Sequence, residues 1–424
     1  MSIAPTSGPR ILARPDHPVS RRHIASNAIK VLYRLHRAGF KAYLVGGAVR
    51  DLMMERPPKD FDLSTDARPQ QVRKLFRNSR IIGRRFRLAH VFFRDGIVEV
   101  STFRRNPDPE AQESAPGELL ITDDNVFGTP EEDAFRRDFT VNALFYNVAD
   151  FSVIDYVGGI EDLEEGLIRA IGDPAVRFRE DPVRMLRACE LAGRLGFRLE
   201  EGTREAVRSH RSEIEKASPA RLTEELIQLL RCAAAAPAFQ MMLELGLLET
   251  LLPEAYLLLR ASQHGAGEFE QILPALDRMV RGDAEFSDAG LLSILLLPKV
   301  LLRRRDVETM GGGRISRAAL GRLTSEAVVP FLQRFGLSRA RAEQIQQALW
   351  AFHRLGEPWR TAAQRIRFAG SPGFDDAFHL LEILVEATGQ GGKELGIWRE
   401  IRRRRPQAPS AGPTRRRRRR RRRR

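Results

Sequence analysis

The sequence predicts an α+β fold in which a small α/β head precedes an all-helical body and a cationic tail. The periodicity of the apolar residues carries most of this prediction. Short apolar runs alternate with turn residues early in the chain, whereas leucine, alanine and arginine recur at helical spacing between residues 174 and 400. The composition is that of a packed protein, since 42% of the 424 residues are hydrophobic and 29% are charged. Wholesale disorder and a fibrous fold are therefore excluded.

The head is predicted to begin with a helix, a strand and a second helix. Ser20 is suited to cap the first helix and Gly39 to end it. The apolar run at 40–45 is short enough for a strand, and residues 48–54 open the next helix. The apolar residues of the first helix recur on one helical face: Ile24, Ala28, Val31, Leu32 and Leu35.

A β-hairpin follows, and then a long helical region. Two apolar runs, 88–93 and 97–103, flank Asp95-Gly96, a dipeptide typical of tight turns. Strand signals disappear beyond residue 174. The apolar stretch at 291–302 is too short to span a membrane, so we expect a buried helix there.

Charge and cysteine content narrow the function classes. The net charge of +15 comes almost entirely from fourteen arginines at 402–405 and 415–424, in a segment with little to bury that we expect to be disordered. Cys189 and Cys232 supply neither a disulfide framework nor a zinc site. Residues 1–20 lack the apolar core of a secretory signal. We therefore expect a cytoplasmic protein without membrane partners.

A pair of aspartates is the sharpest candidate for chemistry. Asp60 and Asp62 flank Phe61, so in a strand both carboxylates would project from one face. Aligned carboxylates suit Mg²⁺, and two such ions can activate an attacking oxygen and stabilise a leaving one in phosphoryl transfer. An isolated Asp-x-Asp is also typical of a polar turn. The surrounding residues have to decide between these interpretations.

A glycine pair provides a candidate phosphate site. Gly46 and Gly47 lie between the predicted strand and the next helix, where bare backbone can approach phosphate oxygens. A plain tight turn is the alternative. Arg50 on the following helix is a candidate phosphate ligand that Asp51 would orient, with a surface ion pair as the alternative.

Two further groups of residues extend the candidate site. Glu99 falls in opposite phase to its apolar strand neighbours, so it is either a third carboxylate facing the aspartates or a solvated strand residue. A second cluster combines guanidinium, carboxylate and amide groups, which suits the phosphates and ribose of a nucleotide. A charged helix start is the alternative for this cluster. Its members are Arg136, Arg137, Asp138 and Asn142.

The segment that starts at Glu180 opens a predicted helix with Pro182 in its first turn, so Asp181 suits an N-cap. Arg184 and Arg187 lie one and two turns along the same helix face as Glu180. A carboxylate and a guanidinium held on a rigid helix can read the hydrogen-bonding edge of a base. Both interpretations of this segment can hold together.

Four motifs in this order resemble the class II nucleotidyltransferases, the family of tRNA CCA-adding enzymes and bacterial poly(A) polymerases. They are residues 44–51 (LVGGAVRD), 59–62 (KDFD), 136–142 (RRDFTVN) and 180–188 (EDPVRMLRA). The resemblance implies a polymerase-β-like nucleotidyltransferase head with a small mixed sheet, followed by an all-helical neck and body.

The resemblance also implies roles for individual residues. Asp60 and Asp62 would bind the catalytic Mg²⁺, or Mn²⁺ in its place, and Asp138 would be a further catalytic acidic residue near the ribose. The glycine pair and Arg50 would handle the triphosphate, and Asp181 with Arg184 would read the base. The complete candidate nucleotide-binding set is Gly46, Gly47, Arg50, Arg137, Asn142, Asp181, Arg184 and Arg187.

One segment bears on the choice within the family. Residues 81–91 (IIGRRFRLAHV) resemble the segment that marks the poly(A) polymerase branch, and they include His90, which in isolation would suit a hydrophobic core. The arginine-rich end resembles the basic tails of that branch. This implies template-independent transfer of AMP from ATP to the 3′-hydroxyl of RNA, with release of pyrophosphate. A CCA-adding enzyme that uses CTP and ATP is one alternative, and a non-catalytic RNA-binding protein is another.

The resemblance and the patterning together predict five parts and two substrates. The parts are a flexible segment at 1–20, the nucleotidyltransferase head at 21–170, a helical neck with the base-recognition motif at 171–235, an RNA-binding helical body at 236–400 and the disordered tail at 401–424. The expected partners are ATP and RNA 3′ ends, bound largely without regard to RNA sequence.

Overall fold

The computed structural model of the chain describes residues 8–83, 87–105, 126–253, 255–256, 268–311 and 316–404. Residues 84–86 of the branch segment and the part of the predicted tail beyond Arg404 lie outside these ranges. The prediction that the disordered tail begins at residue 401 is wrong, because residues 401–404 form the end of helix α19 (Gly392–Arg404). The chain forms two compact units, Met1–Arg260 and Ala261–Arg424. The α+β architecture that the sequence predicts is confirmed, whereas the boundaries of the head, neck and body stay predictions.

A mixed sheet organises the head. Its strand order is β1-β8-β7-β2-β3-β6-β5-β4, and every neighbouring pair is antiparallel except β3 with β6. The predicted hairpin is confirmed as β5 and β6, in which Phe92 pairs with Ile97. The strands are β1 (Arg10–Leu12), β2 (Ala42–Val45), β3 (Leu63–Thr65), β4 (Ser79–Ile82), β5 (Leu88–Phe92), β6 (Ile97–Thr102), β7 (Leu144–Asn147) and β8 (Val153–Asp155).

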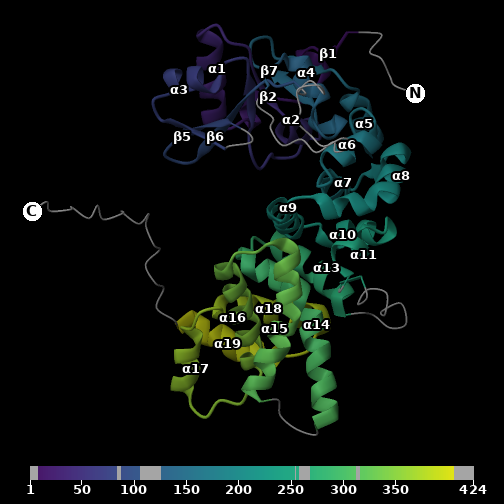
Figure 1. The fold of residues 1–424 in the computed structure, drawn as a ribbon. Coiled ribbons are helices and arrows are strands. Elements are labelled where there is room, and N and C mark those ends of the chain that lie inside the picture. Colours follow the sequence, from purple (N-terminus) through teal and green to yellow (C-terminus); the bar gives the residue numbers. More distant parts are fainter. Residues whose placement is uncertain are drawn as a thin grey trace, which may run out of the picture. The chain divides into compact units, whose positions relative to one another are not determined.

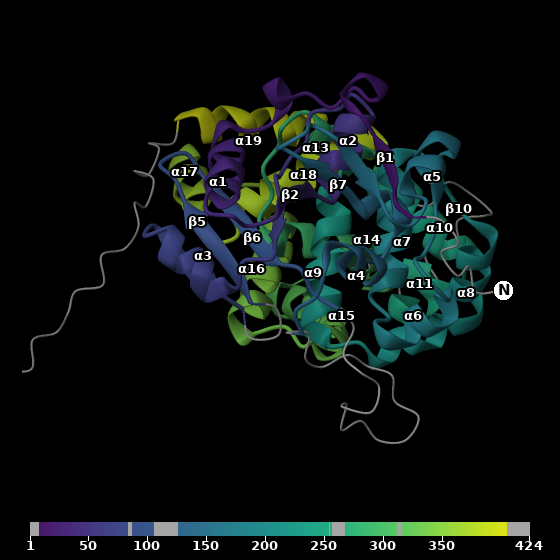
Figure 2. The ribbon, with the colours of Figure 1, turned by 90° about the horizontal axis from the view of Figure 1, so that it is seen from above.

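One face of this sheet forms the main hydrophobic core of the head. Helices α1 (Ser26–Arg37) and α3 (Pro69–Leu75) lie beside β5 and β6 in both views (Figure 1, Figure 2). Leu63 of β3 and Val100 of β6 pair in register and are buried in this core. Because side chains alternate along a strand, the residues just before Leu63 and Val100 face the other side of the sheet. That side carries the polar residues of the candidate site.

Two predictions about the start of the chain are wrong. Ser20 caps the short 3-10 helix η2 (Arg21–His23), and α1 begins later, at Ser26. Residues 10–12, which we expected to be flexible, form β1 and pair with β8. For β1 the partner strand β8, which local sequence does not reveal, decides the backbone conformation.

Helices dominate the rest of the first unit. The exception to the predicted absence of strands is β10 (Arg198–Leu199), which pairs in parallel with β9 (Leu167–Ile168). The longer elements are α4 (Pro130–Phe135), α5 (Gly159–Glu165), α6 (Pro174–Glu180), α7 (Arg184–Leu195), α8 (Glu201–His210), α9 (Pro219–Arg231), α10 (Ala235–Glu244) and α11 (Leu247–Leu251).

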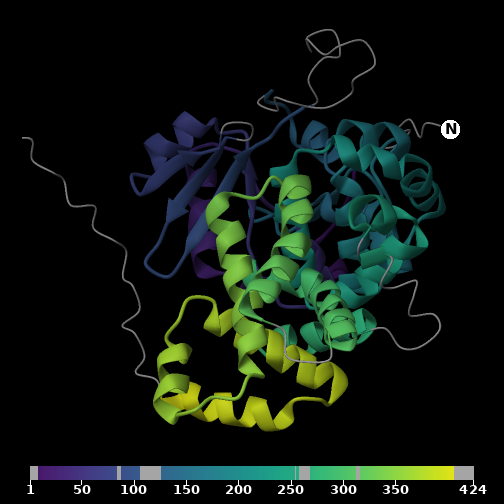
Figure 3. The ribbon, with the colours of Figure 1, turned by 60° about the horizontal axis from the view of Figure 1, so that its bottom comes forward.

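Every regular element in the described part of the second unit is a helix (Figure 3). The apolar stretch at 291–302 lies within α14 and most of it is buried, which confirms the predicted buried helix. No helix among the described residues has the length and apolar character to cross a membrane. The helices are α13 (Glu268–Arg281), α14 (Asp288–Gly311), α15 (Arg317–Phe335), α16 (Arg339–Leu355), α17 (Ala362–Ala369), α18 (Phe374–Thr388) and α19 (Gly392–Arg404).

Candidate active site

A cavity of about 770 Å³ in the first unit is lined by segments that adjoin strands β2, β3 and β7 and by helices α7 and α9. Glu99, Arg136 and Glu180 do not line this cavity. All residues of the predicted catalytic and nucleotide-binding sets do, although they come from segments far apart in the sequence. They are Gly46, Gly47, Arg50, Asp60, Asp62, Arg137, Asp138, Asn142, Asp181, Arg184 and Arg187.

The two aspartates share the cavity but lie just outside a strand. β3 begins at Leu63, one residue after Asp62, so the prediction that the Asp-x-Asp lies within a strand is wrong. The Val45 N–H still donates to the Asp62 carbonyl at 3.0 Å, which extends the β2–β3 pairing to this residue. Enclosure by the cavity and then the negative charges of Glu99 and Asp60 raise the pKa of Asp62 to about 6, against the opposing charge of Arg137.

Glu99 faces the same side of the sheet as Asp62. The parallel β3–β6 register aligns Leu63 with Val100, so the preceding residues, Asp62 and Glu99, are neighbours. Glu99 does not line the cavity, and its side chain is 47% exposed and pairs with His90, with 3.1 Å between Oε1 and Nε2. His90 is therefore half-buried beside a carboxylate, and the core position that it would suit in isolation is wrong.

The glycine pair connects β2 to α2 (Gly47–Met53). Gly46 has φ 73° and ψ −139°, a backbone conformation that side chains disfavour, and a Cβ there would lie 3.4 Å from Nη1 of Arg137. Arg50 on α2 is only 2% exposed and donates to Asp51 at 2.7 and 2.9 Å and to Asn142. The alternative of a surface ion pair for Arg50 is therefore wrong.

The cluster around Arg137 follows the end of helix α4, so its interpretation as a charged helix start is wrong. Asp133 on α4 accepts two hydrogen bonds from Arg137, at 2.9 and 3.2 Å. Arg137 also donates to the Asn142 carbonyl at 3.2 Å and to Ser64 Oγ at 3.4 Å. These contacts hold the guanidinium beside the glycine turn in the cavity.

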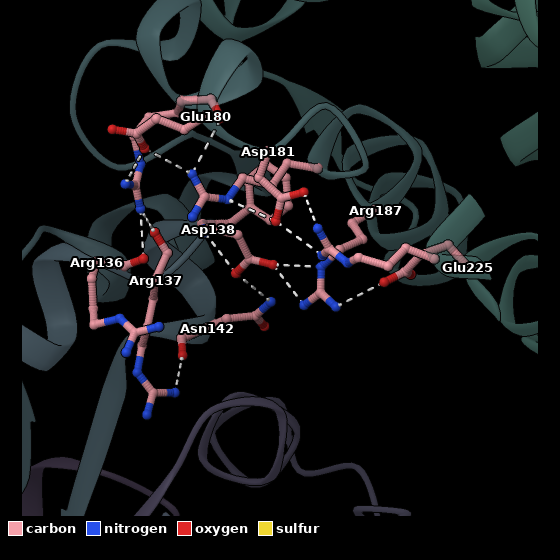
Figure 4. Close-up of polar contacts among 12 residues, drawn as sticks. Arg136, Arg137, Asp138, Asn142, Glu180, Asp181, Arg187 and Glu225 are labelled. Atoms are coloured by element: carbon pink, nitrogen blue, oxygen red, sulfur yellow. Dashed lines mark hydrogen bonds and ion pairs between the residues drawn. The ribbon is translucent and has the colours of Figure 1, made fainter. Parts of the chain in front are cut away.

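Asp138 connects the head to helix α7 through Arg187. Figure 4 shows Arg187 between Asp138 and Glu225, with 2.6 Å from its Nη2 to Oδ2 of Asp138 and 3.4 Å from its Nη1 to Glu225. Burial alone would raise the pKa of Asp138, but the charge and hydrogen bond of Arg187 and the charge of Arg184 outweigh it, and the pKa falls to about 2. Asp138 therefore stays ionised.

Asp181 is fixed by an arginine that the sequence did not single out. It is the C-cap residue of α6, and its carboxylate accepts hydrogen bonds from both terminal nitrogens of Arg221 on α9. The prediction that Asp181 is an N-cap is wrong, because α7 begins only at Arg184 and no side chain caps it.

The two arginines of α7 have different partners. Arg184 donates to Glu180 at 3.4 Å and to the Arg177 carbonyl at 3.2 Å. The prediction that Glu180 shares a helix face with both arginines is wrong, because Glu180 ends α6 and the arginines lie on α7. Arg184 still contacts Glu180, whereas Arg187 contacts Asp138 and Glu225. Arg177 itself is buried and donates to the carbonyls of residues 136 and 137 at 2.6 and 2.7 Å.

Sequence reasoning missed Arg221, Glu225 and Asp133. Arg221 and Glu225 are opposite charges four residues apart on α9, a pattern that also occurs on ordinary solvated helices. Asp133 lies in the first turn of α4, where acidic residues are common. Nothing local separates these residues from surface charges, because their partners come from other segments.

The carboxylates of Asp60 and Asp62 suit a divalent cation that is bound jointly by the protein and the substrate. No group of three or more His, Cys, Asp or Glu side chains in the described ranges is arranged to hold a metal ion. Asp60 and Asp62 supply hard oxygen donors at one edge of the cavity, and each lacks an ion pair within the part of the chain described. Mg²⁺ is commonly bound by one or two carboxylates together with water and substrate phosphates, so the residues present fit it.

Two family models match the first unit of this chain. A model described as the poly A polymerase head domain matches residues 42–169. A model described as the probable RNA and SrmB-binding site of polymerase A matches residues 196–258. The first covers most of the sheet and the glycine turn, and the second covers α9.

Curated relatives extend the similarity. Poly(A) polymerase I of Salmonella typhi is 45% identical over 67% of this chain, which spans 63% of that relative's length. Poly(A) polymerase I of Haemophilus influenzae is 35% identical over 92% of this chain and 86% of its own length. The CCA-adding enzyme of Bacillus velezensis is 38% identical over 53% of this chain and 55% of its own length.

A solved structure shares the fold. The Bacillus stearothermophilus CCA-adding enzyme in complex with CTP superposes with a TM-score of 0.61 at 27% identity, covering 88% of this chain and 81% of that one.

Proposed function

Because this chain belongs to the class II nucleotidyltransferase family, we propose that it transfers AMP from ATP to the 3′-hydroxyl of RNA without a template, releasing pyrophosphate. The similarity to poly(A) polymerases carries the choice within the family. Poly(A) polymerase I relatives are 45% identical over 67% of this chain and 35% identical over 92% of it, whereas CCA-adding enzymes are 38% identical over 53% and 32% identical over 78%. We place this activity in the cytoplasm.

Asp60 and Asp62 are the proposed metal ligands, with Glu99 as a candidate third carboxylate behind them. Bound Mg²⁺, or Mn²⁺, would supply charge neutralisation at the phosphates and lower the pKa of the attacking hydroxyl. Enclosure, and then the charges of Glu99 and Asp60, raise the pKa of Asp62, so a bound cation would offset the cost of ionising this carboxylate. A cation and the RNA 3′ end are therefore expected to bind here above pH 6.

The other residues that line the cavity are proposed to bind the nucleotide. The glycine turn and Arg137 would contact the triphosphate, because bare backbone and a fixed guanidinium meet there. Arg50 would act indirectly, because it donates a hydrogen bond to the side chain of Asn142 and holds that side chain in place. Asp138, which stays ionised, would accept from the ribose, and Asp181 with Arg184 would read the base edge.

Primer extension tests this proposal. A short RNA is incubated with Mg²⁺ and each nucleotide separately, and a tRNA that lacks its terminal CCA is run in parallel. We expect long products with ATP alone. Exactly three additions on the tRNA from CTP and ATP would instead identify a CCA-adding enzyme.

Alanine at Asp60 or at Asp62 should remove nearly all AMP incorporation while RNA binding survives, because neither side chain supports the fold. A variant with the wild-type turnover would refute the assignment of the metal ligands. A wild-type chain that incorporates no nucleotide would favour the non-catalytic alternative.

A further inference from the structure

We propose that the first unit carries a second ligand site, separate from the catalytic cavity, which binds a small phosphate monoester of the size of a nucleoside monophosphate. The site is a cavity of about 380 Å³ near the start of the chain, and we call it the arginine cavity. Small-molecule sites commonly have volumes of about 300–1,000 Å³. The polar residues that line the arginine cavity are Arg14, Ser20, Arg21, Arg22 and Tyr146.

The arginine cavity and the catalytic cavity have no lining residue in common. Tyr146 of β7 belongs to the main hydrophobic core of the head, together with Leu63 and Val100. Asp62 and Glu99 face the other side of the sheet, because side chains alternate along a strand. A ligand in the arginine cavity would therefore be separated from the catalytic carboxylates by the sheet.

The charged groups that line the arginine cavity are all positive. Arg14 lies in the 3-10 helix η1 (Arg14–Asp16), and Arg21 and Arg22 lie in η2. Within the described ranges, these guanidinium groups contact a carbonyl, a hydroxyl and an aromatic ring, but no carboxylate. Asp16 and Asp150 lie nearby, and neither lines the cavity. A bound anion would supply the negative charge that these arginines lack.

The polar side chains also keep hydrogen-bond donors for an anion. Arg14 donates through Nη1 to a backbone carbonyl at 3.1 Å, and Arg21 donates through Nη1 to the Tyr33 hydroxyl at 2.7 Å. Each guanidinium has further N–H groups, which these contacts do not use. The Ser20 hydroxyl accepts from the Arg22 N–H at 3.4 Å, so its own proton can be donated to a ligand.

Tyr146 points most directly to a ligand. The residue is only 1% exposed and lines the cavity, yet its hydroxyl has no hydrogen-bond partner in the part of the chain that the structure describes. A buried hydroxyl without a partner costs stability, which a bound acceptor would recover. Burial raises the pKa of Tyr146 against the charges of Arg21 and Arg14. The hydroxyl therefore stays protonated beside two guanidinium groups and can donate to the same anion.

The apolar part of the lining suits an organic group attached to the phosphate. It consists of Ile29 of α1, Phe151 in the turn between β7 and β8, and the ring of Tyr146. Phe151 has φ 63°, a conformation that bulky residues disfavour, and Nε2 of His17 lies 2.8 Å from its carbonyl oxygen. The Arg21 guanidinium lies over the Phe151 ring, 4.2 Å from its centroid. The fold thus holds this ring in place despite backbone strain, as is typical of ligand sites.

A phosphate monoester fits these groups better than the phosphodiesters of RNA do. A monoester has about two negative charges and three terminal acceptor oxygens near neutral pH. A phosphodiester has only one negative charge. Three guanidinium groups and two hydroxyls supply donors for all the oxygens of a monoester, and the remaining apolar wall can contact a sugar or a base.

Calorimetry on the full chain tests this site with AMP as the probe. EDTA is present, so that no divalent cation assists binding in the catalytic cavity. We expect a single saturable site that binds AMP about 10-fold or more tightly than inorganic phosphate, because only AMP reaches the apolar wall. Arg21→Met and Arg22→Met should each weaken AMP binding roughly 10-fold, and Tyr146→Phe roughly 5-fold, because each removes donors to the phosphate.

Two control variants match these substitutions. Arg34 of α1 also lies over a phenylalanine, Phe76, at 5.0 Å, and Tyr43 of β2 lies on the strand next to β7. Neither Arg34 nor Tyr43 lines either cavity. Arg34→Met and Tyr43→Phe should therefore leave AMP binding unchanged, and so should Arg184→Met in the catalytic cavity.

Several outcomes would overturn the inference. They are the absence of saturable AMP binding, equal affinity for AMP and inorganic phosphate, and unchanged AMP affinity in both Arg22→Met and Tyr146→Phe. Loss of AMP binding in Arg184→Met would place the nucleotide in the catalytic cavity instead. Displacement of AMP by an RNA oligonucleotide with a 5′-hydroxyl, which contains only phosphodiesters, would make the arginine cavity part of an RNA surface. None of these measurements requires AMP incorporation, so failure of this inference is distinguishable from failure of the proposed function.

Discussion

Replacing Asp62 by asparagine is expected to stabilise the first unit in the absence of a divalent cation. The carboxylate titrates near 3.8 in an unfolded chain and at about 6 in the folded protein, because of enclosure and then the charges of Glu99 and Asp60. Ionisation of Asp62 therefore costs stability as the pH rises from about 4 through 6, and asparagine removes that cost.

The magnitude follows from the same two values. A change from 3.8 to about 6 corresponds to about 3 kcal/mol for a fully enclosed carboxylate. The side chain of Asp62 is exposed to solvent where it faces the cavity. Solvent screening therefore reduces the expected gain in unfolding free energy to about 1 kcal/mol. The gain should be present above pH 6 and absent below pH 4, and Mg²⁺ should stabilise the wild type more than the variant.

Urea unfolding measures this effect, and the chain provides its own internal control. All five tyrosines lie in the first unit and all three tryptophans in the second. Near-UV circular dichroism of tyrosine should show a higher midpoint for Asp62→Asn at pH 8, whereas tryptophan fluorescence should not change. Equal or lower tyrosine midpoints at pH 8 would refute the reasoning about uncompensated charge.

Three further predictions follow from other contacts. Asp138→Asn should cost about 2 kcal/mol of unfolding free energy at pH 7, because the pKa of Asp138 is about 2 in the folded protein and 3.8 in an unfolded chain. In urea titrations this loss of stability should shrink as the pH falls from 4 toward 2. Gly46→Ala should cost roughly 1–2 kcal/mol and raise the KM for ATP, given φ 73° and the 3.4 Å approach of a Cβ to Arg137; unchanged thermal midpoints would contradict it. Truncation after Arg404 should weaken RNA binding roughly 10-fold or more in low salt and flatten its salt dependence while kcat is retained, as measured by fluorescence anisotropy and primer extension; equal affinities in 50 mM salt would exclude a role for the tail.

The resemblance of four short motifs was sufficient to indicate the family, because each motif combines a local backbone requirement with fixed side chains. Gly46 needs a positive φ, and Leu63 alternates with polar neighbours in a paired strand. Such features act over a few residues, so they are visible in the sequence. The confirmed hairpin of β5 and β6 has the same origin, since a two-residue turn fixes the register.

The partners of the site charges could not be read in the same way. Arg221 and Asp181 are 40 residues apart, and Arg187 and Asp138 are 49 residues apart. Before the chain folds, each is simply a charged residue near a helix end. Alternatives such as an N-cap at Asp181 or a surface ion pair at Arg50 were therefore as consistent with the local sequence as the observed contacts.

The sequence by itself determined the early helix–strand–helix order, the β5–β6 hairpin, the glycine turn and the two neighbouring aspartates, since short-range sterics and apolar periodicity specify them. Only the tertiary structure decided which charges face each other across the cavity and which remain open to a ligand. The physical reason is that ion pairing depends on distance in space, and folding sets that distance by packing apolar faces that carry no information about the charges beside them.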